Sequence, residues 1–458
     1  MIAKTICALA TPPGHSAIAV VRLSGPDSKN ILLKVCPRLK NRNIQSHQLK
    51  LTDFLNADDS RLDQVVVSYF AKGKSYTGEE SVEFNCHGSP FVVEKIIQRL
   101  IDSGAVMATP GEFTYRAFMN GKIDLVQAEG VLSVIESDSE QSLKIANRQL
   151  GGKLSEIFKR IVSELTWCLA HIEASIDFST EGLDVVDNKV LENKLIGLRQ
   201  EVSTLIQSFN TGRALKEGIF VTLLGKPNSG KSSLLNNFLE TDRAIVSAIA
   251  GTTRDVVDGE TVYKGFLIRF SDTAGVRSTQ DEIEKIGIEK SLKSAHGSDA
   301  VFYIYDAALG LTTDEEKFLV QQNFNVPIFI IGNKSDLLKV STPPNTLSSA
   351  LGTHLVQRLS TTALKTETRE IVLGELIKLF KTKPSQENSL ISSARQFELT
   401  SEAYKHLDDC ISDFKKGLGA EFISQRLKEA LVSLQKVLGE HYDDQILDRV
   451  FKEFCLGK

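Results

Sequence analysis

A glycine-rich stretch with the spacing of a phosphate-binding loop follows an apolar run at residues 219–224. It reads Gly225-Lys-Pro-Asn-Ser-Gly-Lys-Ser, which fits G-x-x-x-x-G-K-S between a strand and a helix. The glycines let backbone N–H groups approach the α- and β-phosphates, and the following helix N-terminus adds a positive dipole. In this pattern Lys231 reaches the β- and γ-phosphates and the Ser232 hydroxyl coordinates Mg²⁺. The motif alone leaves open a glycine-rich turn that binds no ligand.

Two further motifs concern the phosphates and their metal ion. Asp272-Thr-Ala-Gly follows a strand-like run at 267–271, so Asp272 is placed as a Walker-B-type carboxylate and Gly275 as the residue that senses the γ-phosphate. Gly251-Thr-Thr-Arg-Asp lies between these motifs in the sequence. It supplies Thr253 as the expected second protein ligand of Mg²⁺.

Two more motifs concern the base. Asn333-Lys-Ser-Asp ends an apolar run at 327–331, and Asp336 can accept hydrogen bonds from guanine N1–H and the 2-amino group. Adenine offers neither donor, so its binding would leave a carboxylate unpaired. Thr362-Ala-Leu follows the strand-like run 354–359, in the place where GTPases usually carry Ser-Ala-Lys. There the N–H of Ala363 is expected to contact guanine O6.

Together these motifs predict a GTP site. The residues assigned to it are Asn228, Ser229, Gly230, Lys231, Ser232, Ser233, Ser247, Ala248, Ile249, Ala250, Gly251, Thr252, Thr253, Asp272, Thr273, Ala274, Gly275, Asn333, Lys334, Ser335, Asp336, Thr362, Ala363 and Leu364.

The residue that positions the attacking water is not evident from these motifs. Many regulatory GTPases carry a Gln directly after the D-x-x-G glycine, but this chain carries Val276, which cannot hydrogen-bond to water. The acidic stretch Asp281-Glu-Ile-Glu offers carboxylates for the task. A solvated loop fits the same spacing, and the sequence does not choose between them.

The periodicity of the sequence predicts three kinds of domain. Residues 1–118 mix strand-like runs at 18–23, 64–70 and 81–86 with a helix-like segment at 91–101, which favours a small α/β domain. Apolar stripes at helical spacing cover 154–176, 191–209, 423–438 and 446–454. The first two stripes suggest an antiparallel helical hairpin. Helical blocks on both sides of the nucleotide-binding region predict one bundle interrupted by an inserted domain.

Composition excludes several other classes of protein. The chain has 458 residues, 41% of them hydrophobic and 24% charged, with a net charge of −4, so a folded protein of two or three domains is expected. No apolar run approaches the ~20 residues that cross a bilayer, the start does not resemble a signal peptide, and a cytoplasmic location is expected. The six cysteines show no metal-binding spacing and are expected to be reduced and mostly buried.

Motifs at both ends of the chain extend the pattern. They include Thr11-Pro-Pro-Gly, Tyr76-Thr-Gly-Glu, Thr109-Pro-Gly-Glu-Phe-Thr-Tyr-Arg-Ala-Phe and the terminal Phe454-Cys-Leu-Gly-Lys. With the nucleotide motifs, including Ile249-Ala-Gly-Thr-Thr-Arg-Asp, they make the whole chain resemble the MnmE (TrmE) family of bacterial tRNA-modification GTPases. Family members usually carry Ile where Leu456 stands.

The resemblance implies an α/β plus all-α architecture. Its parts are an N-terminal α/β domain at 1–118 that binds tetrahydrofolate and dimerises, a helical domain at 119–216 and 381–458, and an inserted P-loop, Ras-like G domain at 217–380.

The resemblance also implies a potassium-dependent hydrolysis. K⁺ would be bound by the Asn228 side chain and by backbone carbonyls near Ser247, Ile249 and Thr252, and would supply positive charge in the transition state. Family pattern selects Glu284 from the acidic stretch to position water, and Lys231 joins it as a catalytic residue.

A folate site is implied at Arg22, Glu83, Lys122 and Lys458, where a formyl- or methylene-tetrahydrofolate would bind. Taken by themselves, Arg22 and Lys122 would be ordinary surface charges. Cys455 beside the terminal lysine is a candidate nucleophile, although a lone thiol is more often inert.

The implied reaction adds a carboxymethylaminomethyl or aminomethyl group to C5 of the wobble uridine (U34) of certain tRNAs. The implied partner is MnmG, which uses FAD and NADH, and two copies of each protein would form a heterotetramer. Two alternatives remain at this point: a ribosome-assembly switch of the Era/Der type without one-carbon chemistry, and a structural scaffold in which GTP is vestigial.

Overall fold

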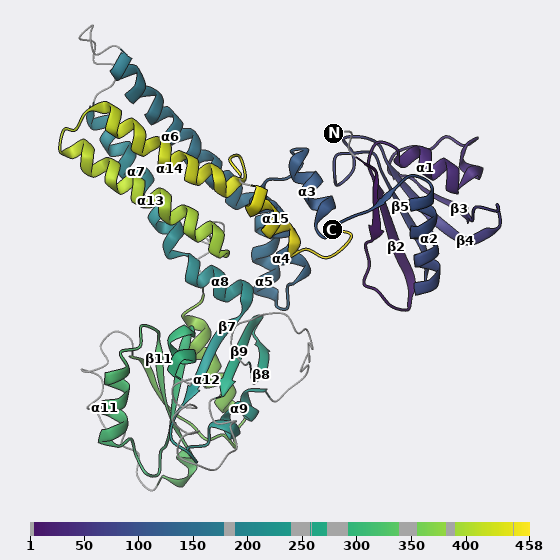
Figure 1. Cartoon of the computed structure of the whole chain (residues 1–458). Coiled ribbons are helices and arrows are strands. Elements are labelled where there is room, and N and C mark those ends of the chain that lie inside the picture. Colours follow the sequence, from purple (N-terminus) through teal and green to yellow (C-terminus); the bar gives the residue numbers. More distant parts are fainter. Residues whose placement is uncertain are drawn as a thin grey trace. The chain divides into compact units, whose positions relative to one another are not determined.

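The structure, a computed structural model, describes residues 4–177, 188–239, 257, 259–272, 292–338, 355–381, 390–442 and 444–458 (Figure 1). It divides into two compact units, and each is described by itself. Unit 1 comprises Met1–Leu132, Gln149–Leu183 and Gly419–Lys458, and unit 2 comprises Ser133–Arg148 and Asp184–Leu418.

Unit 1 contains a six-stranded sheet in the order β3-β4-β5-β2-β1-β6. The strands are β1 (Ile6–Leu9), β2 (Ser16–Ser24), β3 (Leu49–Leu55), β4 (Arg61–Phe70), β5 (Ser81–Gly88) and β6 (Val106–Met107). All neighbours are antiparallel except β1 and β6. Alternation in β2 places Val21 and Leu23 in the core and Arg22 on the other face.

Two helices cover the apolar face of this sheet. They are α1 (Ser28–Val35), which leads into a 3-10 turn at Pro37–Leu39, and α2 (Pro90–Asp102). Leu32 of α1 and Ile96 of α2 share one core with Val21 and Phe84 of the strands. The opposite face of β2 and β5 is therefore left for polar side chains.

The remaining helices of unit 1 bring both ends of the chain together. They are α3 (Glu112–Met119), α4 (Leu125–Ile135), α6 (Lys153–Asp177), α14 (Ala420–Leu438) and α15 (Asp444–Lys452). Helix α6 packs against α14, and α15 packs against α3. Phe118, Leu125, Phe451 and Phe454 form a shared core there. The C-terminal segment is thus built into the unit that also contains the first strand.

Unit 2 contains a second six-stranded sheet in the order β12-β11-β10-β7-β9-β8. The strands are β7 (Ile219–Leu224), β8 (Gly259–Tyr263), β9 (Phe266–Asp272), β10 (Ala300–Asp306), β11 (Ile328–Asn333) and β12 (Leu355–Ser360). Every neighbouring pair is parallel except β8 and β9. A near-continuous apolar run such as β11, in which all six residues are buried, is typical of a parallel strand covered on both faces.

Helices cover both faces of this sheet. They include α9 (Lys231–Leu239), α11 (Thr313–Gln322) and α12 (Glu367–Lys378). Phe238 of α9 and Val372 of α12 lie in one core, and Leu319 of α11 lies in the core on the other face. Unit 2 also contains α7 (Asn188–Gln207), α8 (Phe209–Glu217) and α13 (Ala394–Lys415), and α7 packs against α13.

The predicted fold class, α/β combined with all-α, is confirmed. The four domain boundaries remain predictions; the compact units group α6 with α14 and α7 with α13. The loop of the predicted hairpin lies outside the described residues, so that hairpin also stays a prediction. Helix α5 (Glu140–Leu150) begins in unit 2 and ends in unit 1. Within the part of the chain that the structure describes, no helix is long and apolar enough to cross a membrane.

Candidate functional site

The nucleotide motifs of unit 2 gather at the carboxyl edge of its parallel strands. Strand β7 runs directly into the glycine-rich loop, and Asp272 lies opposite Leu223 at the end of β9. On the other side, Asp306 of β10 pairs in register with Asn333 of β11. Because parallel strands end at one edge of the sheet, residues from four loops meet there, which is where open α/β sheets bind ligands.

Two glycines of the loop are required by close packing. Gly225 has φ +143°, and a Cβ there would lie 2.0 Å from the carbonyl oxygen of Ile304. Gly230 has φ +91°, and its Cβ would lie 2.1 Å from Nδ2 of Asn333. Both positions therefore exclude any side chain, because the close neighbours leave no room and φ is positive. Asn228 also has a positive φ, +62°.

The loop lysine is held near the phosphate position by the loop itself. Lys231 is buried, and its Nζ donates to the carbonyl oxygens of Gly225, at 2.8 Å, and Lys226, at 2.9 Å. Lys226 points away and donates to the Thr312 hydroxyl at 3.0 Å, beside Glu315 at 3.3 Å. The buried ammonium thus has carbonyl partners that phosphate oxygens could replace.

Asn333 joins the loop to the base-recognition segment. Its Nδ2 donates to the carbonyl oxygen of Ser229 at 3.1 Å, and its Oδ1 accepts the N–H of Ala363 at 3.0 Å. The side chain is 2% exposed. One asparagine therefore links the glycine-rich loop to the Thr362-Ala-Leu segment.

The next residue adds a charged link. Lys334, at φ +61°, donates from Nζ to the carbonyl oxygen of Asn228 at 2.9 Å and to Oδ2 of Asp306 at 2.6 Å. The Lys334 ammonium holds the pKa of the Asp306 carboxyl below its ordinary value. Asp336 follows in the 3-10 turn Ser335–Leu337 and is exposed, so its carboxylate is open to a base.

The fifth motif forms a turn that is held from beneath. Thr362 and Lys365 close it through a backbone hydrogen bond of 3.2 Å, and the Thr368 hydroxyl donates to the Thr362 carbonyl at 2.7 Å. The Ala363 N–H that was expected to meet guanine O6 here donates to Asn333. The Leu364 N–H makes only a 3.5 Å contact with the Thr362 hydroxyl. Of these two N–H groups, that of Leu364 therefore has the weaker hydrogen bond within the protein.

Several predicted site residues are not covered by this description. Ser247, Ala248, Ile249, Ala250, Gly251, Thr252, Thr253, Thr273, Ala274, Gly275 and Glu284 lie outside the described residues. The assignments of Thr253 to Mg²⁺, of three loop carbonyls to K⁺ and of Glu284 to water therefore stay predictions. Ser232 and Ser233 lie at the start of α9 and are exposed.

A second polar cluster lies on the open face of the unit 1 sheet. Arg22 and Glu83 are cross-strand partners on β2 and β5, and the guanidinium contacts Oε1 of Glu83 at 3.0 Å and 2.9 Å. Arg22 also donates to the carbonyl oxygen of Gly457 at 3.2 Å. The half-buried Lys458 belongs to the cluster: burial, and then the Arg22 charge, lower the pKa of its ammonium, while Glu83 opposes that shift. Three of the four predicted folate residues thus meet.

Lys122 and Cys455 complete the comparison with the predicted site. Lys122 is exposed and donates from Nζ to the carbonyl oxygen of Gly73 at 3.1 Å. Cys455 is the exposed cysteine, and the other five are buried and free. The expectation that the thiols are mostly buried is confirmed, and the expectation that they are reduced stays a prediction.

Comparison with known proteins covers both regions of the chain. A family model described as the MnmE helical domain matches residues 125–455, and one described as the GTP-binding protein TrmE N-terminus matches residues 5–122. The tRNA modification GTPase MnmE of Bdellovibrio bacteriovorus is 44% identical over an alignment of 469 residues that covers 99% of this chain and 98% of that protein. This chain belongs to the MnmE family.

Other similar proteins include MnmE of Pseudothermotoga lettingae, which is 37% identical over 454 residues, 99% of each chain. Among solved structures, Era of Aquifex aeolicus is 27% identical with a TM-score of 0.26, over 41% of this chain and 66% of that one. Both family models extend beyond the nucleotide motifs.

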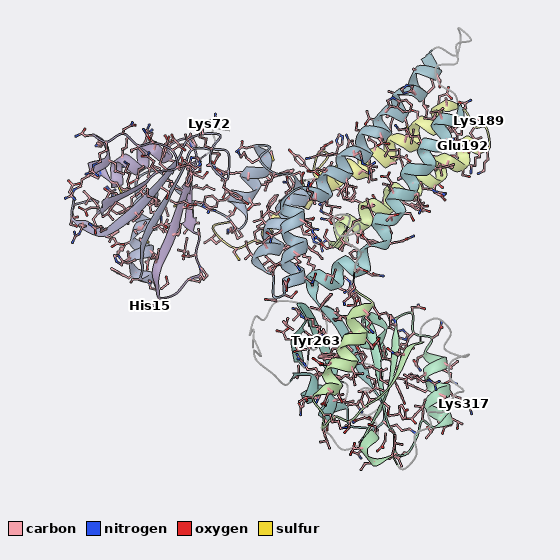
Figure 2. The ribbon with its side chains drawn as sticks, turned by 180° about the vertical axis from the view of Figure 1, so that it is seen from behind. His15, Lys72, Lys189, Glu192, Tyr263 and Lys317 are labelled. Carbon is pink, nitrogen blue, oxygen red and sulfur yellow. The ribbon has the colours of Figure 1, made fainter. Side chains whose placement is uncertain are left out.

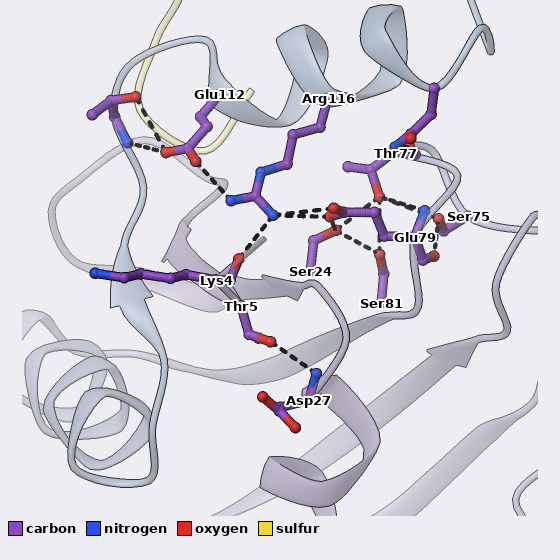
Figure 3. Close-up of polar contacts among 12 residues, drawn as sticks. Lys4, Thr5, Ser24, Asp27, Ser75, Thr77, Glu79, Ser81, Glu112 and Arg116 are labelled. Atoms are coloured by element: carbon purple, nitrogen blue, oxygen red, sulfur yellow. Dashed lines mark hydrogen bonds and ion pairs between the residues drawn. The ribbon is translucent and has the colours of Figure 1, made fainter. Parts of the chain in front are cut away.

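Two sequence motifs of this MnmE family member prove to be tied together (Figure 3). Nη1 of Arg116 lies 3.1 Å from Oε2 of Glu79, and its Nη2 donates to Glu112 at 2.8 Å. The Ser24 hydroxyl donates to the same Glu79 oxygen at 2.8 Å and bonds Thr77 at 2.8 Å. Tyr76-Thr-Gly-Glu is thereby fixed against Thr109-Pro-Gly-Glu-Phe-Thr-Tyr-Arg. This network also holds Tyr76, whose ring lies 5.8 Å from the Arg22 guanidinium.

Sequence reasoning missed the links between motifs in this MnmE chain. The bond from Lys334 to Asn228, the Arg116–Glu79 ion pair and the amide of Asn237 beneath the base loop all join segments far apart in the sequence. Only Glu112 and Arg116, four residues apart on one helix, gave a local signal.

Proposed function

We propose that this chain is a GTP hydrolase that acts in tRNA modification. The observation that carries the proposal is a pair of hydrogen bonds from the Asn333 side chain, one to Ser229 and one to Ala363. They hold the proposed phosphate loop and base loop together at one edge of the sheet. Relatives matching over the full length are named tRNA modification GTPases. An Era/Der-type switch would leave the match at residues 5–122 unexplained.

The residues of unit 2 divide the binding of GTP among them. Asp336 accepts from guanine N1–H and the 2-amino group, and the loop amides and Lys231 bind the phosphates. Phosphate oxygens are stronger acceptors than carbonyls, so the ammonium of Lys231 exchanges its bonds to Gly225 and Lys226 for bonds to GTP. Ser232, with Thr253, would hold Mg²⁺, which neutralises developing phosphate charge. The exposed Ser232 hydroxyl suits that hard cation.

Potassium dependence is the finer part of the proposal. The side-chain amide oxygen of Asn228 is a hard ligand that fits K⁺. Asn228 is exposed, and its backbone carbonyl accepts a hydrogen bond from Lys334. Backbone carbonyls near Ser247, Ile249 and Thr252 would complete the site, and Glu284 would position water. Equal GTP turnover in KCl and NaCl would reject this part of the proposal.

The cluster of Arg22, Glu83 and Lys458 is proposed to bind a tetrahydrofolate that carries one carbon. Basic groups suit the carboxylates of such a ligand and Glu83 suits the donors of its pterin ring. The ring of Tyr76, 37% exposed and 5.8 Å from the Arg22 guanidinium, offers an aromatic face. Lys122, exposed and bound to the Gly73 carbonyl oxygen, would be the fourth residue of the site. Cys455 remains a candidate nucleophile.

We further propose that the chain acts as a dimer with two copies of MnmG, which supplies FAD and NADH. Together they would add an aminomethyl or carboxymethylaminomethyl group to C5 of U34 in tRNA. The deciding experiment is mass analysis of wobble uridines from cells that lack the gene, with and without complementation by wild type or Asp336→Ala. Unmodified uridine that only the wild type restores would support the proposal; normal modification in the deleted strain would reject it.

Titration calorimetry tests the proposed GTP site of unit 2 and the proposed folate site of unit 1 separately. GTP should bind more tightly than ATP, and 5-formyl-tetrahydrofolate should bind wild type but not Glu83→Ala. Absence of heat with the folate would reject the role of unit 1 while leaving GTP binding intact.

A further inference from the structure

A buried amide on α9 lies outside all the nucleotide motifs. Asn237 is 6% exposed, and its Nδ2 donates to the carbonyl oxygens of Ala363, at 3.1 Å, and Lys365, at 3.0 Å. Its Oδ1 is buried and has no hydrogen-bond partner in the described part of the chain. A buried acceptor without a partner is unfavourable, so the two donated bonds are what this residue contributes.

The orientation of the amide follows from its surroundings. The atom that faces the turn lies within hydrogen-bonding distance of two carbonyl oxygens. An amide oxygen in that position would face two acceptors, whereas the NH₂ group supplies two donors. Asn237 therefore binds the turn through both of its N–H bonds.

The Ala363 residue is held on both sides by asparagines. Its N–H donates to Asn333, and its carbonyl accepts from Asn237. Asn333 also binds the Ser229 carbonyl, and Ser229 leads through the phosphate loop into α9, which carries Asn237. The contacts form a closed ring that joins phosphate loop, base loop and helix.

In this arrangement three carbonyl groups of the base loop point into the protein, where side chains donate hydrogen bonds to them. The Thr362 carbonyl accepts from the Thr368 hydroxyl, and the carbonyls of Ala363 and Lys365 accept from Asn237. The N–H of Ala363 donates to Asn333 and that of Lys365 to the Thr362 carbonyl, so among residues 363–365 the N–H left for a base is that of Leu364. Guanine carries an acceptor at position 6, whereas adenine carries an amino donor, which an outward carbonyl would bind.

We propose that Asn237 is a positioning residue that makes the base loop select a purine with an oxo group at position 6. It acts through the loop peptides and does not touch the nucleotide. The inference rests on the proposed GTPase function, since it assumes that guanine lies against this loop. It assigns selection at position 6 to Asn237 and leaves selection at position 2 to Asp336.

Nucleotide analogues that differ at one position test this division. In 6-thio-GTP the oxygen at position 6 is replaced by sulfur, a weak acceptor, and ITP lacks only the 2-amino group. Dissociation constants of the full-length wild type and Asn237→Ala would be measured for GTP, 6-thio-GTP and ITP. We expect the preference for GTP over 6-thio-GTP to fall roughly fivefold to tenfold, the size of one neutral hydrogen bond. The preference for GTP over ITP should stay unchanged.

Two further variants make the result independent of a folding defect. Asn237→Ser keeps one donor and should give an intermediate ratio, while Asn236→Ala changes the exposed neighbour on α9 and should keep the wild-type ratio. A general loss of structure would lower all three affinities together without changing their ratios. Wild type that binds none of the nucleotides would overturn the proposed function as well. Wild type that prefers GTP, beside Asn237→Ala and Asn237→Ser with unchanged ratios, would overturn this inference alone.

Discussion

Single residues set the geometry of the nucleotide site through contacts that allow no substitution. Gly230 combines a positive φ with a neighbour, Asn333, that fills the space where a side chain would begin. Asn333 cannot move without releasing Ser229 and Ala363. Phosphate and base recognition therefore depend on the same few atoms.

Gly230→Ala is expected to abolish GTP binding. Its Cβ would lie 2.1 Å from Nδ2 of Asn333, and alanine at φ +91° is strained in addition, costing about 1–3 kcal/mol. We expect the dissociation constant for GTP, measured by fluorescent-nucleotide titration, to rise more than about tenfold. The matched control is Gly374→Ala on α12, where the nearest atom lies at 3.7 Å and helix propensity favours alanine by about 0.5–1 kcal/mol. Loss of binding in both variants would contradict the steric explanation.

A titratable residue at the same edge gives a pH dependence. The Lys334 ammonium lowers the pKa of Asp306 from its ordinary value of 3.8. A carboxyl with a depressed pKa stabilises the fold above its ordinary pKa, and that contribution is lost as pH falls through the lowered value.

We therefore expect Asp306→Asn to destabilise unit 2 by about 0.5–1 kcal/mol at pH 7, since the pair is partly exposed. The difference in the free energy of unfolding between Asp306→Asn and the wild type should shrink as pH falls below 3.8. Thermal unfolding from pH 7 to pH 3 measures it, and a difference independent of pH would show that the charge of Asp306 is not its contribution.

At the scale of elements, the central strands were predictable and their partners were not. The runs at 219–224 and 327–331 correspond to β7 and β11 because continuous apolar runs are typical of buried parallel strands. The edge strand β8 was missed, since Gly259–Tyr263 mixes polar and apolar residues and β9 is its one neighbour in the described sheet. A linear pattern reveals which face is buried but does not reveal what buries it.

Helix α5 illustrates that limit. It lies outside the predicted G domain, yet Ile145 is 5% exposed within the core formed by β7, β9 and α12. The N–H of Gln141 donates to the carbonyl oxygen of Gly265 in the β8–β9 turn at 3.1 Å. Lys264 of that turn lies over the ring of Tyr263 (Figure 2 labels Tyr263). No periodicity in residues 140–150 distinguishes a helix that packs on this sheet from one that packs in a bundle.

Ile145→Ala should destabilise unit 2 by about 2–4 kcal/mol, because it leaves a cavity in a packed core. The single tryptophan, Trp167, lies in unit 1, so its fluorescence would not report this change. Hydrogen exchange of the backbone amides of β7 and β9 would measure the loss of stability in unit 2. Leu143→Ala, which alters a 41% exposed residue on the same helix, should change stability by less than about 0.5 kcal/mol. Equal exchange in the two variants would show that α5 does not belong to this core.

On the scale of the whole molecule, the two clusters lie in different compact units. The nucleotide edge is built within unit 2 and the Arg22–Glu83–Lys458 cluster within unit 1. The second cluster joins the two ends of the chain, because the carbonyl of Gly457 accepts from Arg22 and the carbonyl of Lys458 accepts from the Phe113 N–H at 3.2 Å. The sequence motifs identified both ends, but only the family resemblance placed them together.

Gly457→Ala should separate the two activities. Gly457 has φ +90°, and a Cβ there would lie 2.2 Å from the carbonyl oxygen of Leu9, so the last residues must move and withdraw Lys458 from Glu83. We expect the affinity for 5-formyl-tetrahydrofolate and the modification of U34 to fall at least about tenfold, the equivalent of 1.4 kcal/mol. GTP turnover should change less than about twofold, because Gly457 belongs to unit 1 and the nucleotide edge is built within unit 2. Leu456→Ala, at an exposed neighbour, serves as the control. Unchanged folate binding, or a parallel loss of GTP turnover, would contradict a ligand site at the joined chain ends.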